Sequence, residues 1–249
     1  MAHPSGPAWL GIGAQRSGTT WFTDLLCQHP RVALGKNRRK EQHFLTIPLA
    51  HGWRPEYREE YLRLFYGGRM RRGEFTPAYL RSPWVPAVAA EVLRPGAPIV
   101  VLLRDPIERY VSAMRLARSN KTMPEAPPTQ ALRRWSQRAG GGGVWAGMYA
   151  SQLEGWASVC GRERIVVQQY EQMVKDPQTT VDVVWRAMGL EPVRLSGIDR
   201  PSWTSRPSSG GWDMDAVPGF RDQLRHLYAP EVKRLVEWGI RPELWPNFA

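Results

Sequence analysis

The sequence predicts an α/β fold in which a mainly parallel β-sheet is flanked by helices. Two short apolar runs, Trp9–Gly13 and Ile99–Leu103, are each followed by a segment with the apolar periodicity of a helix. The second run is apolar throughout, as expected of a strand that is buried on both faces of a parallel sheet. Strands that alternate with helices along a chain are typical of such sheets.

The helices and the third strand can be placed in the same way. The first strand leads through a glycine-punctuated loop into a helix with apolar residues at positions 21, 22, 25 and 26. Ser82 suits the N-cap of a helix over 82–93, and Pro106 suits the first turn of a helix that runs to about Leu116. The other predicted elements are an amphipathic helix over 148–159, a strand over 164–168, and helices over 177–188 and 230–238.

The length of 249 residues suits a single domain, and a hydrophobic content of 42% excludes a wholly disordered chain. Two segments interrupt the alternation of strands and helices. Residues 118–146, with three prolines and a run of four glycines, predict a mobile surface insertion, which fits a variable loop and an acceptor-site lid equally well. Residues 200–217 predict a second long loop.

Basic residues outnumber acidic ones, and the formal net charge is +11. Of the 34 basic side chains 29 are arginine, a bias that a GC-rich genome and a site for anionic ligands explain equally well. Because a diffuse charge excess is weak evidence for nucleic acid, we expect no nucleic-acid partner.

Cysteine content and apolar runs restrict the class of protein further. Cys27 and Cys160 are too few for a disulfide scaffold or a cysteine-rich zinc site. The longest apolar run is far shorter than the ~20 residues that span a bilayer, so we expect no membrane insertion. Residues 1–10 lack the basic flank and apolar run of a signal peptide. We therefore expect a cytoplasmic protein, and the sequence indicates no oligomeric state.

Gly13 and Gly18 frame a four-residue loop between the first strand and its helix, as in a nucleotide-binding P-loop. Backbone N–H groups of such a loop converge on phosphate oxygens, and the helix N-terminus adds positive potential. ATP-binding versions place a lysine directly after the second glycine, where this chain has Thr19; its cation is Arg16, inside the loop. Arg16 also stands where a dinucleotide-binding loop needs its third glycine. The sequence therefore predicts a P-loop-type sheet without ordinary ATP chemistry.

The segments that end the two main strands can be compared with known signatures. They read Gln15-Arg16-Ser17-Gly18-Thr19-Thr20-Trp21 and Leu103-Arg104-Asp105-Pro106-Ile107-Glu108-Arg109-Tyr110-Val111-Ser112. They resemble the two signatures of sulfotransferases that use 3′-phosphoadenosine 5′-phosphosulfate (PAPS) and release adenosine 3′,5′-bisphosphate (PAP). The resemblance implies that the 5′-phosphosulfate is held by Gln15, Arg16, Ser17, Gly18, Thr19 and Thr20, and the 3′-phosphate by Arg104 and Ser112.

Three further segments narrow the resemblance. They are Lys40-Glu41-Gln42-His43-Phe44, Gly73-Glu74-Phe75-Thr76-Pro77-Ala78-Tyr79 and Gly147-Met148-Tyr149-Ala150-Ser151-Gln152-Leu153. They are similar to motifs of the heparan-sulfate-type sulfotransferases and their bacterial relatives. The resemblance covers most of residues 11–190.

Sulfuryl transfer needs a general base for the acceptor proton and a cation at the leaving group. The resemblance implies that Glu41 is the base, whereas without it Glu41 reads as a surface carboxylate beside the basic residues 31–40. His43 is the rival base, or it orients the base or the sulfate. Arg16, where the family usually has lysine, would be the cation at the leaving group. Because less charge must be neutralised than in ATP, no metal is expected.

Two departures from the family pattern concern cations. The family often has lysine at the position of Phe75, and its loss leaves one sulfate or acceptor contact that Arg71 or Arg72 could replace. No segment clearly matches the late cofactor loop of the family, and we assign its contribution to Arg206.

Most of the twelve tryptophans should be core, but those next to loops could stack on adenine or on a sugar-like acceptor: Trp53, Trp84, Trp145, Trp203 and Trp212.

We therefore predict a PAPS-dependent sulfotransferase whose acceptor is a hydroxyl of a small molecule, such as a secondary metabolite, or of a carbohydrate. Two alternatives stay open. A P-loop small-molecule kinase would use Asp105 to hold Mg²⁺. A non-enzymatic basic module would bind polyanions in a manner that salt weakens.

Overall fold

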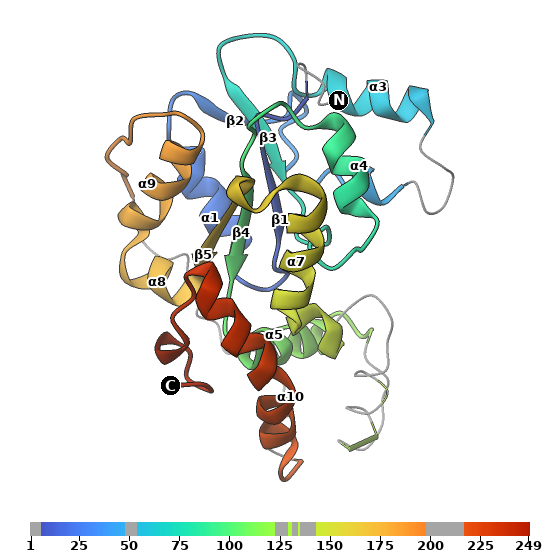
Figure 1. Ribbon diagram of the computed structural model, residues 1–249, viewed down its shortest axis with the longest axis vertical. Helices are drawn as coiled ribbons and strands as arrows, with labels where there is room; N and C mark the ends of the chain where they lie inside the picture. The colour runs from blue at the N-terminus through green and yellow to red at the C-terminus, as the bar shows by residue number, and fades with distance from the viewer. Residues whose placement is uncertain (1–5, 48–53, 123–128, 131–133, 135–142, 198–216) are drawn as a thin grey trace.

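The computed structural model describes residues 6–47, 54–122, 129–130, 134, 143–197 and 217–249 (Figure 1). Five strands form one parallel sheet in the order β2-β3-β1-β4-β5. The strands are β1 (Trp9–Gly13), β2 (Val32–Leu34), β3 (Arg71–Phe75), β4 (Ile99–Leu103) and β5 (Ile165–Gln169). The α-helices are α1 (Thr19–Leu26), α3 (Pro55–Arg63), α4 (Val85–Val92), α5 (Pro106–Ser119), α7 (Tyr149–Cys160), α8 (Tyr170–Lys175), α9 (Pro177–Ala187) and α10 (Phe220–Leu235). Short 3-10 helices are η1 (Phe44–Thr46), η2 (Val144–Gly147), η3 (Arg162–Arg164), η6 (Val236–Trp238) and η7 (Pro242–Leu244).

Helices cover both faces of the sheet. Alternate residues of a strand point to opposite sides, so a single strand contributes side chains to the core on each face. Leu10 and Ile12 of β1 belong to a core that includes residues of α4, α5, α7 and α10. Trp9 of β1 belongs to a second core with residues of α1, α8 and α9. Figure 1 shows these two groups of helices on opposite sides of the strands. The predicted α/β fold, a parallel sheet flanked by helices, is confirmed.

The elements next to the glycine loop and the Arg104 segment agree with the prediction. β1 and β4 have the predicted bounds, β5 and α7 lie one residue later at both ends, and α9 ends one residue earlier than predicted. α5 continues to Ser119, beyond the expected end at Leu116.

Two predicted helix starts are wrong. α4 begins only at Val85, because the Ser82 hydroxyl donates to the carbonyl oxygen of Ala78 (2.9 Å) and does not cap the helix. The last long helix, α10, begins at Phe220 and contains Pro230 in its interior. Its buried face continues across the proline, and packing therefore outweighs the lost backbone hydrogen bond. The apolar side chains of that face are Leu224, Tyr228, Val232 and Leu235.

Besides the short 3-10 helices, four elements were not predicted: β2, β3, α3 and α8. β2 has only three residues, and β3 opens with Arg71 and Arg72, so neither gives an apolar run. The α3 helix is rich in charged residues and buries only Tyr61 and Leu62. β2 and β3 form one edge of the sheet, and residues that follow them line the site described below.

The two predicted long loops fall largely outside the described residues. Of the segment 118–146, α5 accounts for the first two residues and η2 for the last three. The late loop over 200–217 is described only at Val217, and Arg206 lies outside the described residues.

Candidate active site

Residues that follow each of the five strands line one pocket of about 750 Å³. Ligands of open α/β sheets bind at this edge, beyond the carboxyl ends of the strands. The lining residues are Gln15, Arg16, Gly18, Thr19, Thr20, Lys40, Glu41, His43, Pro77, Ala78, Arg81, Arg104, Glu108, Ser112, Arg115, Leu116, Ser119 and Tyr170. The pocket thus contains more cationic than anionic side chains.

The loop between β1 and α1 has left-handed backbone at Arg16 (φ 72°) and Gly18 (φ 80°). A Cβ at Gly18 would lie 2.6 Å from the ring of Tyr170, so glycine is required for both conformation and space. The first amides of α1 have no carbonyl partner within the helix and can bind an anion. Ser17 does not line the pocket: its side chain is fully buried, and its N–H donates to the carbonyl oxygen of Ala14 (3.2 Å).

Arg16 and Arg104 converge from different strands on the same part of the pocket. The Nε of Arg16 donates to the Oγ of Ser112 (3.2 Å), and the Nη1 of Arg104 donates to the carbonyl oxygen of Arg16 (3.4 Å). The guanidinium of Arg104 also lies 5.1 Å from the centre of the Tyr170 ring and 3.8 Å from Glu108. Burial, and then Arg104, lower the pKa of Arg16. Arg16 thus joins the loop after β1 to the side of the pocket that is formed by Arg104 and Ser112.

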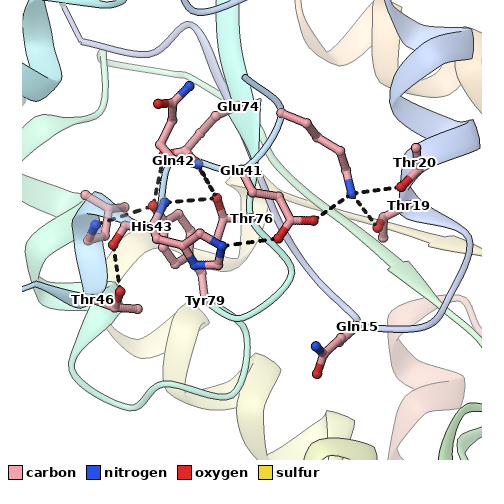
Figure 2. A network of polar contacts seen from close by, with 12 residues as sticks. Gln15, Thr19, Thr20, Glu41, Gln42, His43, Thr46, Glu74, Thr76 and Tyr79 are labelled. Atoms are coloured by element: carbon pink, nitrogen blue, oxygen red, sulfur yellow. Dashed lines mark hydrogen bonds and ion pairs between the residues drawn. The ribbon is translucent and has the colours of Figure 1, made fainter. Parts of the chain in front are cut away.

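Glu41, which also lines the pocket, contacts both Lys40 and His43, and Figure 2 labels Glu41 and His43. Its Oε1 accepts a hydrogen bond from the Nζ of Lys40 (3.1 Å), and its Oε2 lies 3.3 Å from the Nε2 of His43. Lys40 also donates to the hydroxyls of Thr19 (3.0 Å) and Thr20 (3.3 Å) at the start of α1. The carboxylate is therefore linked through Lys40 to the first two residues of α1.

A buried carboxylate, Glu74, holds the segment that carries Glu41 (Figure 2). The backbone N–H of Gln42 donates to Glu74 (3.1 Å) and to the hydroxyl of Thr76 (3.0 Å). Glu74 also accepts hydrogen bonds from Thr76 (2.5 Å), Tyr61 (2.7 Å) and Tyr79 (3.1 Å). Complete burial raises the pKa of Glu74 to about 7, although these four donors act in the opposite direction. Glu74 thus fixes the backbone directly beside Glu41.

A second set of carboxylates supports Arg104. The Oδ1 of Asp105 accepts from the N–H groups of Ile107 (2.9 Å) and Glu108 (3.2 Å) and caps α5. Its Oδ2 accepts from the backbone and the side chain of Asn247 (3.0 and 2.9 Å). Both oxygens of Asp105 are thus engaged, which argues against the magnesium role that a kinase would require. No group of three metal-ligating side chains occurs among the described residues.

Glu171 connects the same region to the C-terminal segment. It accepts hydrogen bonds from the N–H of Asp105 (3.1 Å) and the indole of Trp245 (2.8 Å). Burial raises the pKa of Glu171 to about 7, against the effect of these hydrogen bonds and of Arg104.

Most of the predicted site residues lie together. Those that line the pocket are Gln15, Arg16, Gly18, Thr19, Thr20, Glu41, His43, Arg104 and Ser112. Ser17 lies behind the loop, and Arg206 is not described. Of the tryptophans that sequence placed beside loops, Trp145 is 49% exposed and donates to the carbonyl oxygen of Arg81 (3.1 Å), but neither it nor Trp84 lines the pocket. Trp53, Trp203 and Trp212 lie outside the described residues.

Sequence reasoning missed Lys40, Arg81 and Tyr170 as pocket residues. Tyr170 follows β5 directly, and this position at a strand end is a signal that could have identified it. Lys40 opens the motif that contains Glu41, but its basic neighbours favoured a solvated face. Arg81 donates to the amide oxygen of Gln15 (2.9 Å), a contact that no local pattern indicates.

Arg71 and Arg72 do not replace the lysine that the family has at position 75. They stand at the start of β3, whereas the pocket lies at its end, and Arg72 donates to the carbonyl oxygen of Leu34 (3.1 Å). The Phe75 side chain is fully buried. It is Lys40 that brings a cation to this place, with its Nζ 5.7 Å from the centre of the Phe75 ring.

Comparisons with known proteins show the family of this chain. The family model described as the sulfotransferase domain matches residues 9–198. The chain is 31% identical over 124 residues to the membrane-associated sulfotransferase kil1 of Dictyostelium discoideum, a match that covers 47% of this chain and 25% of that protein. It is 27% identical over 207 residues to the bifunctional heparan sulfate N-deacetylase/N-sulfotransferase 4 of Mus musculus, covering 75% of this chain and 22% of that protein. The chain thus spans a quarter or less of these curated relatives.

A solved structure matches almost the whole chain. The sulfotransferase from Alicyclobacillus acidocaldarius aligns with a TM-score of 0.69 and 25% identity, covering 93% of this chain and 95% of that one. No helix in the described parts of the chain is both long and apolar enough to cross a membrane. Since the family model covers well over half of the residues and the fold agrees, this protein belongs to the sulfotransferase family.

Proposed function

We propose that this sulfotransferase takes the sulfuryl group from PAPS and transfers it to a hydroxyl group of a small-molecule or carbohydrate acceptor. The observation that carries the proposal is that one pocket combines the phosphate-binding loop, the Arg104–Ser112 pair and Glu41. The single-domain organisation and the cytoplasmic location stay predictions from the sequence.

The donor set of the pocket suits a nucleotide with two anionic ends. The loop and the first turn of α1 offer amides, the Thr19 and Thr20 hydroxyls and the Arg16 guanidinium to a phosphosulfate. Arg104 and Ser112, at the end of β4 and on α5, offer a guanidinium and a hydroxyl to the 3′-phosphate. Tyr170 contacts both regions, since its ring packs on Gly18 and lies beside Arg104.

In the proposed reaction the acceptor oxygen attacks sulfur while its proton passes to Glu41. The bond between sulfur and the bridging oxygen breaks, and its electron pair stays on the 5′-phosphate of PAP. Arg16 is the cation placed to stabilise the charge that develops on that phosphate. His43, which contacts Glu41, orients the base; it becomes the base itself if Glu41 proves dispensable.

The acceptor class follows from the chemistry of the pocket and from one relative. Arg81, Arg115 and Ser119 also line the pocket, and side chains of these types can donate hydrogen bonds to an acceptor. The name of the mouse relative indicates N-sulfation of heparan sulfate, so it supports a carbohydrate acceptor and not the choice of a hydroxyl as the accepting group. A polar acceptor such as a carbohydrate fits both observations, and the hydroxyl stays an expectation from the sequence.

The direct test incubates the protein with ³⁵S-labelled PAPS and a panel of carbohydrate and small-molecule acceptors, followed by mass spectrometry of the labelled product. We expect label in a sulfate ester, and PAP should inhibit its formation. A protein that binds neither PAP nor PAPS and labels no acceptor would contradict the proposal. Phosphorylation of the same panel from ATP would favour the kinase alternative. Binding of heparin that PAP does not disturb, without label transfer, would favour the polyanion-binding module.

A further inference from the structure

Lys40 lies between the phosphate-binding loop and the proposed base. Its Nζ contacts the Thr19 and Thr20 hydroxyls on one side and the carboxylate of Glu41 on the other (Figure 2). Two of these three partners are neutral hydroxyls. An anionic oxygen of a ligand can replace them without breaking the ion pair between Lys40 and Glu41. The ammonium group has three N–H donors and can therefore keep Glu41 while it binds another oxygen.

The proposed reaction brings like charges together at this point. The sulfuryl group of the donor is anionic, and Glu41 accepts a proton only when it is ionised. A like charge within a few ångströms disfavours the ionised carboxylate and raises its pKa. A carboxylate base beside a sulfated donor therefore needs a cation between the two groups.

We propose that Lys40 is a catalytic residue that binds the sulfuryl oxygens of the donor and keeps Glu41 ionised while the donor is bound. This inference rests on the proposed function and assigns the cation that Phe75, Arg71 and Arg72 do not supply. Lys40 stays protonated throughout. The proton of the acceptor goes to Glu41, and the electron pair of the broken S–O bond goes to PAP.

The surroundings of Lys40 fit this role. Its side chain is 17% exposed, so its charge is poorly screened by water. Burial lowers the pKa of Lys40, whereas Glu41 and Asp24 of α1 raise it. His43 lies 3.3 Å from Glu41, and the other charged side chains that line the pocket are Arg16, Arg81, Arg104, Glu108 and Arg115.

The test compares two nucleotides that differ only by the sulfuryl group. Calorimetric titration without acceptor gives the Kd of PAPS and of PAP for the wild type, Lys40→Met and Lys40→Arg. We expect Lys40→Met to weaken PAPS binding by about tenfold or more and PAP binding by less than about twofold, the size of one charge-assisted hydrogen bond. Lys40→Arg should restore most of the affinity for PAPS.

A second readout is the pH profile of kcat at saturating donor. In Lys40→Met the acidic limb should move to higher pH by about one unit, because Glu41 then faces the donor without its cation. Lys36→Met is the matched control, since Lys36 precedes Glu41 in the same segment but packs over the Tyr66 ring (4.3 Å) and does not line the pocket. If Lys40→Met melts at a lower temperature than the wild type, both measurements are repeated with Lys40→Gln.

Equal weakening of PAPS binding and PAP binding overturns the inference. So does an acidic limb that stays in place in Lys40→Met and Lys40→Gln. A wild-type protein that binds neither nucleotide instead overturns the proposed function, and the role of Lys40 with it. The two failures are therefore distinguishable.

Discussion

The pocket has two ends, each next to a buried carboxylate. We call them the proposed reaction end, with Lys40 and Glu41, and the proposed recognition end, with Arg104. At the reaction end, the buried Glu74 accepts a hydrogen bond from the N–H of Gln42, the residue that follows Lys40 and Glu41. At the recognition end, Arg104 is followed by the buried Asp105, which Asn247 and Glu171 hold. Burial raises the pKa of Glu74 at one end and of Glu171 at the other to about 7.

The difference lies in how far apart in the sequence the partners are. The reaction end is assembled from residues 40–79, so the base and its support come from neighbouring elements. The recognition end joins β4 and α5 to the C-terminal segment, 142 residues away. We infer that changes at the reaction end alter turnover, whereas changes at the recognition end alter nucleotide affinity.

The largest effect should follow loss of the base. Glu41→Gln removes the proton acceptor but keeps the shape of the side chain, and we expect kcat to fall by ~10²–10⁴-fold while the Kd of PAP stays within about twofold. Steady-state kinetics and calorimetry measure the two quantities. Glu59→Gln on the surface of α3 is the control. Undiminished turnover would move the role of base to His43.

At the recognition end, Arg104→Ala should show the reverse pattern. Loss of a guanidinium from a phosphate site should raise the Kd of PAP by about 10–100-fold, with kcat at saturating PAPS changed by only a few-fold. Arg186→Ala, on the exposed side of α9, controls for the loss of a surface arginine. A fall in kcat as large as that of Glu41→Gln would erase the distinction between the two ends.

The carboxylates Glu74 and Glu171 should show the same contrast, with Glu74 affecting kcat and Glu171 affecting nucleotide affinity. Glu74→Gln places amide hydrogens where donors already point, so we expect the segment of Glu41 to shift and kcat to fall by about tenfold with little change in the affinity for PAP. Glu171→Gln should instead weaken PAP binding by a few-fold and spare kcat. Identical profiles of the two variants would show that these carboxylates serve folding alone.

The smallest effect concerns stability against pH. Because burial raises the pKa of Glu74 and Glu171 from 4.5 to about 7, the folded state keeps protons that the unfolded state has lost between these values. The free energy of unfolding should therefore fall as pH rises through this window, by at most ~1.4 kcal/mol per pH unit for each group. Urea unfolding between pH 4.5 and 8 should give a smaller slope for each Glu→Gln variant. A slope equal to that of the wild type would contradict the assigned burial effect.

Local patterns were sufficient to predict the central part of this fold. β1 and β4 are uninterrupted apolar runs that end in glycine or in Asp105-Pro106, so strand, loop and helix are all marked in the sequence. The phosphate-binding loop and Arg104 could be placed at one sheet edge for the same reason. β2 and β3 escaped prediction because they are short or begin with arginine, and their burial depends on neighbours that the sequence does not reveal.

The supports of the site could not be predicted, because each depends on a contact across the fold. Glu74 is an acid within a polar motif, and nothing local indicates that it is completely buried among two tyrosines and a threonine. Asn247 contacts Asp105 across a sequence separation of 142 residues. Lys40 belongs to a run of basic residues whose other members face solvent or lie outside the pocket.

The central claim is that one pocket binds a nucleotide by both of its anionic ends. Its most direct measurement is the calorimetric Kd of PAP and of adenosine 5′-monophosphate, which lacks the 3′-phosphate, for the wild type, Arg104→Ala and Glu41→Gln. We expect the wild type and Glu41→Gln to prefer PAP by about 100-fold, and Arg104→Ala to lose most of that preference. Equal affinity of the wild type for the two nucleotides, or an undiminished preference in Arg104→Ala, would contradict the claim.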